Sequence, residues 1–149
     1  MYKFLKVIVK AIFFSLFRVK IIGKENLKFE GKMIIYSNHV AAIDPFFIHC
    51  MLDRMPRFMA KKEIFQNKLI AWVVTKLGAF PVDRDNADMN SIKTAFRVLN
   101  NGEILGIFPE GRRTTDGKMG KFLPGAAMIA LRANAPMLPM YISRRMKPF

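Results

Sequence analysis

The stretch KMIIYSNHVAAIDPFFIHCMLD, residues 32–53, decides the fold of this chain. It begins with an apolar run, 32–38, whose length and composition are typical of a strand buried on both faces of a sheet. His39 follows where that strand ends. Asp44 and Pro45 then begin a predicted helix, PFFIHCMLD, because proline is favoured in the first helical turn. The stretch therefore predicts a buried strand that passes through a short turn into a helix.

Strands and helices alternate along the rest of the chain as well. Further strands are predicted at 19–23, 57–62, 79–84, 103–108 and 136–143. Further helices are predicted at 63–77, from a cap at Asp85 or Asn86 to Leu99, and from Pro124-Gly125 to 134, with Gly78 and Asn101-Gly102 as C-terminal caps. This alternation predicts a single α/β domain with a mostly parallel central sheet flanked by helices.

The predicted helix 63–77 carries apolar residues at helical spacing. They are Ile64, Phe65, Leu69, Trp72, Val73 and Leu77. A stripe of this kind normally packs against a core, so we expect Trp72 to face inward.

Length and composition indicate one ordered domain with a polyanionic partner. A chain of 149 residues suffices for one core, and 52% apolar residues with a mean hydropathy of +0.15 exclude intrinsic disorder. The 25 Lys and Arg against 11 Asp and Glu give a net charge of +14, which attracts nucleic acid or an anionic membrane.

Hydrophobic composition favours the membrane over nucleic acid. The chain has 14 Phe and 11 Met, which benefit a protein that lies on lipid. Its aromatic residues mostly follow helical core spacing and do not alternate with Lys and Arg as base-stacking platforms would. Cys50 is the sole cysteine, so neither an intrachain disulfide nor a multi-cysteine metal site can form, which fits a reducing cytosolic compartment.

The N-terminal segment 3–17, KFLKVIVKAIFFSLF, is predicted to be a basic amphipathic helix. Lys3, Lys6 and Lys10 share one face, and apolar side chains cover more than half of the helix. Spanning a bilayer takes about 20 mostly apolar residues, and this run is interrupted by Lys10. We therefore assign residues 1–18 to a membrane-associating helix and 19–149 to the main domain. An ordinary core-covering helix and a shallow membrane-embedded helix remain alternatives. The expected location is peripheral or monotopic, at the cytoplasmic face of the cell membrane.

His39 and Asp44 form the first candidate constellation. A turn between strand and helix can fold the Asp44 carboxylate onto one imidazole nitrogen, which fixes the tautomer and stabilises the imidazolium. The other nitrogen can then take a proton from a substrate hydroxyl. This is the base half of a serine-protease-like triad, with the substrate's hydroxyl in place of the serine. The spacing alone also allows a surface histidine beside an unrelated capping aspartate.

The second constellation is the polar loop 108–114. Glycine at 111 allows close backbone approach, and the guanidinium groups of Arg112 and Arg113 can bind a phosphate through two parallel hydrogen bonds. Glu110 can orient an arginine or contact a substrate hydroxyl. A polar turn with solvated arginines is the alternative at this point.

Arg84 is a third candidate phosphate ligand, although an ion pair with Asp83 or Asp85 is an equal alternative. His39, Arg84 and Glu110 all follow predicted strands. In parallel α/β sheets, ligands gather at the carboxyl ends of strands. Neither an HExxH or CxxC motif nor a Walker-type loop occurs, so the motifs support neither a metal site nor nucleotide hydrolysis.

Together these residues resemble the glycerolipid acyltransferase family, which includes the 1-acyl-sn-glycerol-3-phosphate acyltransferases. Four blocks match the family in order and separation, over roughly residues 20–142. They are Asn38-His39-x4-Asp44, similar to the catalytic H-x4-D motif; GAFPVDR at 78–84, which ends in a substrate-binding arginine; FPEGRRT at 108–114, similar to F-P-E-G-T-R-S; and APMLPM at 135–140, the proline-containing block.

The resemblance implies transfer of a fatty acyl group from acyl-CoA or acyl-carrier protein to the sn-2 hydroxyl of lysophosphatidic acid, giving phosphatidic acid. It implies no metal and no cofactor beyond the thioester donor. His39 would be the base and Asp44 its orienting partner, and the acceptor-binding positions would be Arg84, Glu110, Gly111 and Arg113. Another lysophospholipid or glycerol-3-phosphate as acceptor, and a non-catalytic lipid-binding remnant, are the alternatives.

The chain departs from the family pattern in three places. Ala41 stands where a small hydroxyl residue is usual between the histidine and the aspartate. Arg112 replaces a threonine and adds a cation that can alter acceptor choice. The chain ends at Phe149, soon after the fourth block, whereas family members usually continue with further sheet and helix. We therefore expect either a pared-down fold or a C-terminally shortened chain.

Overall fold

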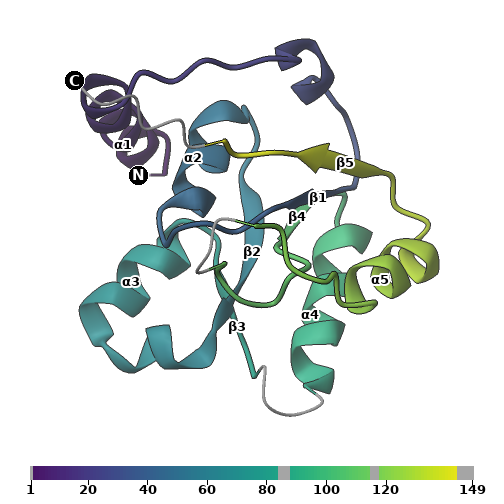
Figure 1. Ribbon diagram of the computed structural model, residues 1–149. Coiled ribbons are helices and arrows are strands. Elements are labelled where there is room, and N and C mark those ends of the chain that lie inside the picture. The colour runs from purple at the N-terminus through teal and green to yellow at the C-terminus, as the bar shows by residue number, and fades with distance from the viewer. Residues whose placement is uncertain (1, 84–87, 115–117, 144–149) are drawn as a thin grey trace.

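A five-stranded parallel sheet forms the centre of the protein (Figure 1). The computed structural model describes residues 2–83, 88–114 and 118–143. The strands are β1 (Met33–Ser37), β2 (Pro56–Lys61), β3 (Phe80–Val82), β4 (Ile104–Ile107) and β5 (Met137–Met140), in the order β3-β2-β4-β1-β5. Every strand pairing is parallel. The predicted α/β class and parallel sheet are confirmed.

Helices cover both faces of this sheet. The α-helices are α1 (Tyr2–Leu16), α2 (Asp44–Met51), α3 (Lys68–Lys76), α4 (Met89–Asn100) and α5 (Gly125–Ala133), and two 3-10 helices are η1 (Lys24–Leu27) and η2 (Lys62–Gln66). Helices α4 and α5 pack against each other on one face, and α2 lies on the other face with α1 against it (Figure 1).

Strand β1 separates two hydrophobic cores. Ile34 points into the core beneath α4 and α5, whereas Met33 and Ile35 point into the core beneath α2. Successive side chains of a strand alternate between faces, so a strand covered on both sides must be apolar at every position. This burial explains the continuous apolar run from which β1 is predicted.

Gly106 in β4 makes room for an aromatic ring on the face of the sheet that α2 covers. A Cβ atom at this position would lie 2.2 Å from the Phe58 ring, far inside van der Waals contact. Only glycine therefore lets the Phe58 ring lie over the sheet, where it stacks on Phe108 with a centroid separation of 5.6 Å. Phe108 also stacks on the ring of His39, so these aromatic side chains support that histidine.

The predicted strand at 19–23 is wrong. The five strands of the described sheet pair with one another, and residues 19–22 pair with none of them, not even with the edge strand β5. The segment runs as an irregular connection in which Ile22 is almost fully exposed. Gly23 then takes a left-handed conformation, with φ of +76°, and begins η1.

The predicted helix 63–77 is broken at Asn67. This residue has an extended backbone, and its side-chain oxygen accepts hydrogen bonds from the N–H groups of Leu69 at 3.0 Å and Ile70 at 3.1 Å. It therefore caps a new helix, α3, which ends before Gly78 as predicted. The predicted inward orientation of Trp72 is also wrong, because its side chain is exposed.

Helix α4 begins later than predicted. Asp88, not Asp85 or Asn86, is its N-cap, and its carboxylate accepts hydrogen bonds from the N–H groups of Asn90 and Ser91. The other oxygen of Asp88 accepts from the N–H of Asp83, which joins the end of β3 to the helix. Residues 84–87 lie outside the described part of the chain.

Helix α1 is confirmed as a helix, but its basic face is not wholly outward. Lys6 turns toward α2 and donates a hydrogen bond to the carbonyl oxygen of Leu52. Lys10 is exposed and lies over the Phe14 ring. The exposed apolar side chains of α1 include Val7, Ile8, Ile12 and Leu16. Among the described residues, no helix combines the length and hydropathy needed to cross a membrane.

Candidate active site

His39 lies directly after β1, at the carboxyl edge of the sheet. Its imidazole stacks on the Phe108 ring, which follows β4, with ring centroids 4.1 Å apart and planes inclined by 19°. The backbone carbonyl of His39 accepts a hydrogen bond from the N–H of Thr114 at 2.9 Å. Neighbouring parallel strands thus bring the two predicted motifs together, because β1 and β4 end side by side.

Asp44 is completely buried beneath His39. Its Oδ2 lies 3.1 Å from the His39 Nδ1 and accepts hydrogen bonds from the N–H groups of Val40 at 2.6 Å and Ala41 at 2.7 Å. The turn between β1 and α2 therefore folds around the carboxylate, as predicted. Substitution at position 41 leaves this contact unaffected, since it is made by the backbone.

The surroundings of Asp44 keep its carboxylate ionised. Burial alone would raise its pKa, but the hydrogen bonds from His39, Ala41 and Val40 outweigh burial and lower the pKa below its ordinary value. An ionised carboxylate can only accept hydrogen bonds, so the His39 Nδ1 must carry the hydrogen. The Nε2 atom is then left with a lone pair that can accept a proton.

Glu110 holds the backbone of the site in place. One carboxylate oxygen accepts a hydrogen bond from the His39 N–H at 3.0 Å, and the other accepts from the Gly120 N–H at 2.7 Å. Only 7% of Glu110 is exposed. Glu110 was predicted to bind the acceptor. In this structure it connects the segment after β1 to the loop that contains Gly120, a role that its position in the sequence did not indicate.

Asn38 makes a similar connection to the segment that follows the last strand. Its side-chain amide donates to the carbonyl of Ile142 at 3.0 Å, and its side-chain oxygen accepts from the Ile142 N–H at 2.8 Å. Asn38 belongs to the recognised motif, but its role depends on a residue 104 positions away. No local pattern could have revealed that contact.

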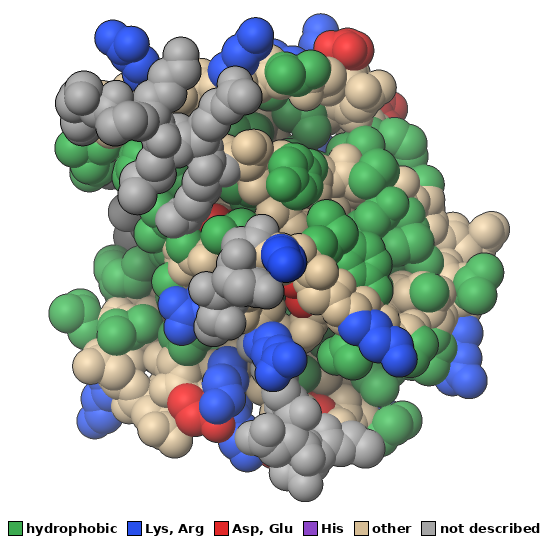
Figure 2. Space-filling view, in the orientation of Figure 1, with side chains coloured by type: hydrophobic (Ala, Val, Ile, Leu, Met, Phe, Trp, Pro, Cys, Tyr) green, Lys and Arg blue, Asp and Glu red, His purple; other side chains and the backbone are tan. Residues whose placement is uncertain are grey.

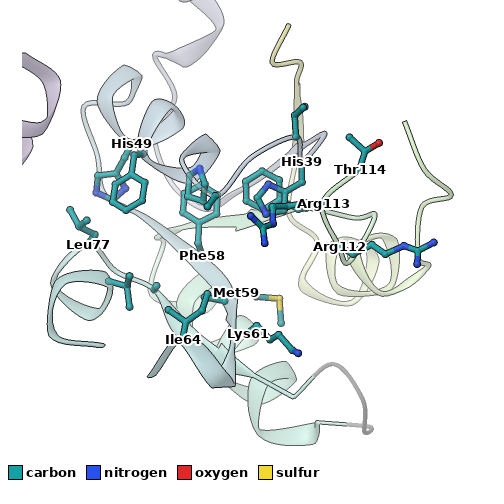
Figure 3. A pocket seen from close by; sticks show the side chains of 18 residues that line it. His39, His49, Phe58, Met59, Lys61, Ile64, Leu77, Arg112, Arg113 and Thr114 are labelled. Atoms are coloured by element: carbon teal, nitrogen blue, oxygen red, sulfur yellow. The ribbon is translucent and has the colours of Figure 1, made fainter. Parts of the chain in front are cut away.

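A pocket of about 800 Å³ extends from His39 between α2 and α3. Figure 3 shows His39 and Arg113 at one end, His49 and Leu77 at the other, and the Phe58 ring between them. Most of the lining is hydrophobic, and His39, Arg113 and Thr114 give one end of it a polar character. This shape suits a ligand with a long apolar part and a polar end.

Three cationic side chains line this pocket: Arg112, Arg113 and Lys61. Arg113 lines the same pocket as His39 and precedes Thr114, whose N–H donates a hydrogen bond to the His39 carbonyl, whereas Arg112 points away from the centre of the pocket (Figure 3). Lys61 comes from the end of β2 and was missed by sequence analysis, although its place at a strand end was a usable signal. Arg84, the other predicted phosphate ligand, lies outside the described residues.

The loop that carries Arg113 depends on Gly111. Its φ is +68°, a left-handed conformation that favours glycine, and its N–H donates to the carbonyl of Phe108 at 3.0 Å. A Cβ atom here would lie 2.8 Å from the Leu123 Cδ1. Gly111 therefore shapes the loop through its backbone.

His49 lines the far end of the pocket and is buried in α2. Burial, together with the charge of Lys6, lowers the pKa of His49 to about 4. It is therefore neutral near pH 7, as expected of a histidine packed inside the protein. Within the described ranges, no three His, Cys, Asp or Glu side chains gather where they could hold a metal ion.

Fold and site together define a class of protein: a parallel α/β domain with a carboxylate-oriented histidine and flanking cations at the carboxyl edge of its sheet. The chain belongs to the Acyltransferase family, whose model matches residues 18–143.

Individual relatives agree with this assignment. The chain is 41% identical over 140 residues to a 1-acyl-sn-glycerol-3-phosphate acyltransferase of Bacillus subtilis, covering 93% of this chain and 69% of the relative. It is 35% identical over 128 residues to a protein of the same name from Limnanthes douglasii, covering 84% of this chain and 45% of that relative.

A solved structure shares the fold. It is that of the 1-acyl-sn-glycerophosphate (LPA) acyltransferase PlsC from Thermotoga maritima, with a TM-score of 0.73 and 24% identity. The similarity covers 93% of this chain and 57% of the Thermotoga chain. The shared region is therefore the α/β domain, and the relatives extend beyond it.

Proposed function

We propose that this protein transfers a fatty acyl group from a thioester donor to the sn-2 hydroxyl of lysophosphatidic acid, forming phosphatidic acid. The observation that carries the proposal is the His39 Nδ1 to Asp44 Oδ2 contact of 3.1 Å beside a mostly apolar pocket. The names of the relatives support the choice of acceptor.

In the proposed reaction, His39 acts as general base through its Nε2 atom. It takes the proton of the acceptor hydroxyl as that oxygen attacks the thioester carbonyl carbon. The C–O bond forms and the C–S bond breaks as the tetrahedral intermediate collapses, and the imidazolium returns the proton to the departing thiolate. Asp44 stabilises the imidazolium without taking its proton, because its pKa is held low.

The acceptor's phosphate is proposed to bind the cations at the polar end of the pocket. Arg113 is best placed, since it lines the pocket at the end where His39 lies (Figure 3), and Lys61 lines the same cavity. A guanidinium can bind a phosphate through two parallel hydrogen bonds, and an ammonium adds a point charge. We retain Arg84 as a further proposed ligand. Glu110 and Gly111 would support acceptor binding indirectly, by shaping the loop.

Membrane association is proposed to occur through α1. The apolar side chains of Val7, Ile12 and Leu16 are exposed on α1, and the net charge of +14 favours anionic lipid. The protein would sit peripherally or monotopically at the cytoplasmic face. Leu16→Glu is expected to weaken sedimentation with phosphatidylglycerol vesicles more than Ser15→Glu, an equally charged neighbour. Equal sedimentation of both variants would count against α1.

The test of the reaction is an acyl-transfer assay in mixed micelles with the purified protein and labelled acyl-CoA or acyl-carrier protein. Lysophosphatidic acid, glycerol-3-phosphate and lysophosphatidylcholine are offered as separate acceptors. We expect the highest kcat/KM with lysophosphatidic acid. Faster acylation of either other acceptor would overturn the choice of acceptor. Binding of lysophosphatidic acid without turnover from either donor would favour a non-catalytic lipid-binding protein.

A further inference from the structure

Helix α3 presents an apolar face to solvent that no described element covers. Its exposed apolar side chains are Leu69, Ile70 and Trp72, with 73%, 47% and 53% of their surface accessible. Val74 lies one turn after Ile70 on the same side of the helix and lines the pocket with Leu77, just beyond the helix end. Leu69 and Trp72 lie on the other side of the helix. The helix is therefore apolar on two sides, of which the pocket and core explain only one.

Charge distinguishes what can cover the outer face. The helix sequence KLIAWVVTK contains no acidic residue, and its two lysines, Lys68 and Lys76, are exposed at either end. Basic residues that flank an exposed apolar patch complement the anionic headgroups and acyl chains of a bilayer. An indole suits that boundary as well, since its ring is apolar and its N–H can remain hydrated.

The position of α3 is consistent with the same assignment. Helices α1 and α3 lie on the same side of the molecule, at the left in Figure 1, and hydrophobic side chains project along that edge in Figure 2. Leu69 and Trp72 on α3 and Val7 and Leu16 on α1 are all exposed. Two exposed apolar helices on one side can contact one flat surface together.

We propose that the outer face of α3, formed by Leu69 and Trp72, inserts into an anionic phospholipid bilayer as a membrane contact separate from α1. The flanking lysines stay at headgroup level. One consequence rests on the proposed function: because α3 is also a wall of the pocket, a lipid chain can pass from the bilayer into the pocket along this helix.

The chain carries its own reporter, because Trp72 is its sole tryptophan. On addition of phosphatidylglycerol vesicles, the emission of Trp72 is expected to shift to shorter wavelength and to be quenched by phospholipids brominated on their acyl chains. Phosphatidylcholine vesicles are expected to give a smaller shift, since they offer no net charge. The assay contains no substrate, so a failure of acyl transfer would not change its outcome.

Matched variants separate insertion from a general charge effect. Leu69→Glu is expected to abolish the shift and the quenching. Leu131→Glu makes the same change at a leucine that is 82% exposed on α5, on the other side of the molecule, and is expected to preserve both. Equal losses in the two variants would overturn the proposal.

Two further outcomes would also overturn it. One is unshifted emission from protein that sediments with the vesicles, which would mean that α3 stays in water while another surface binds. The other is an emission shift that depends on protein concentration without vesicles and does not change when they are added. That result would assign the face to a second copy of the chain. Neither outcome would affect the proposed acyl transfer, which a micelle assay measures separately.

Discussion

At the scale of single residues, Asp44 determines which nitrogen of His39 can accept a proton. Its carboxylate accepts hydrogen bonds from the imidazole and from the backbone N–H groups of Val40 and Ala41. In Asp44→Asn, a neutral amide replaces the charge that stabilises the imidazolium. If its N–H₂ group faces Nδ1, the amide also loses the bonds from Val40 and Ala41 and stabilises the wrong tautomer. We expect kcat to fall by about 10³–10⁴-fold, the size of effect known for such a change in a serine-protease triad.

The control is Asp53→Asn, which makes the same change at an exposed carboxylate just beyond α2. It is expected to keep wild-type kcat. Retention of more than about a tenth of the activity by Asp44→Asn would contradict the orienting role, since so small a loss is within the range of indirect effects.

Glu110 allows a test between positioning and acceptor binding. In Glu110→Gln, the amide N–H₂ must face one of two backbone N–H donors, those of His39 and Gly120, so a buried hydrogen bond is lost. We expect a lower kcat and a loss of stability of about 1–3 kcal/mol, with a smaller rise in the acceptor's KM because the loop is less well held. A large rise in KM at unchanged kcat would show instead that Glu110 binds the acceptor.

The low pKa of His49 predicts that the stability of the fold depends on pH. Its pKa is about 4 in the folded protein and near 6.5 when unfolded, so the unfolded state binds the proton first as the pH falls. Stability is therefore present above pH 6.5 and is lost as the pH falls toward 4, by about 2 kcal/mol between pH 7 and pH 5. Urea unfolding at these two pH values measures it, and His49→Gln is expected to lose most of this difference. An equal difference in His49→Gln would contradict the assignment.

At the scale of elements, Asn67 decides where α3 begins. Its side chain satisfies two backbone N–H groups of the first turn. Asn67→Ala is expected to destabilise the protein by about 0.5–2 kcal/mol, and Asn67→Asp, which keeps the accepting oxygen, by much less. Urea unfolding compares the two. Equal stability of Asn67→Ala and wild type would show that the cap contributes nothing.

The same elements show what sequence reasoning can and cannot reach. The strand β1 was predictable because burial on both faces requires a continuous apolar run. The apolar run at 19–23 follows a similar pattern, but a local pattern cannot tell whether a segment reaches an edge of the sheet. Helical spacing over 63–77 concealed the break at Asn67, since one polar residue hardly changes the period.

At the scale of the whole molecule, the predicted site depended on parallel strands ending at one edge. From that rule we expect His39 and the 108–114 loop to lie close together, and the structure shows that they do. The hydrogen bonds of Glu110 with His39 and of Asn38 with Ile142 could not be predicted from local sequence patterns, because they join residues 71 and 104 positions apart. The outward face of α3 was missed for a related reason: spacing identifies an apolar stripe but not what it packs against.

The central claim is that His39 activates the acceptor hydroxyl, and one measurement tests it most directly. Phosphatidic acid formed from lysophosphatidic acid and acyl-CoA is quantified by mass spectrometry for wild-type protein and His39→Ala, each shown by circular dichroism to be folded. The account predicts formation by the wild type and a loss of at least about 10³-fold in His39→Ala. Wild-type rates in the folded His39→Ala protein would contradict it.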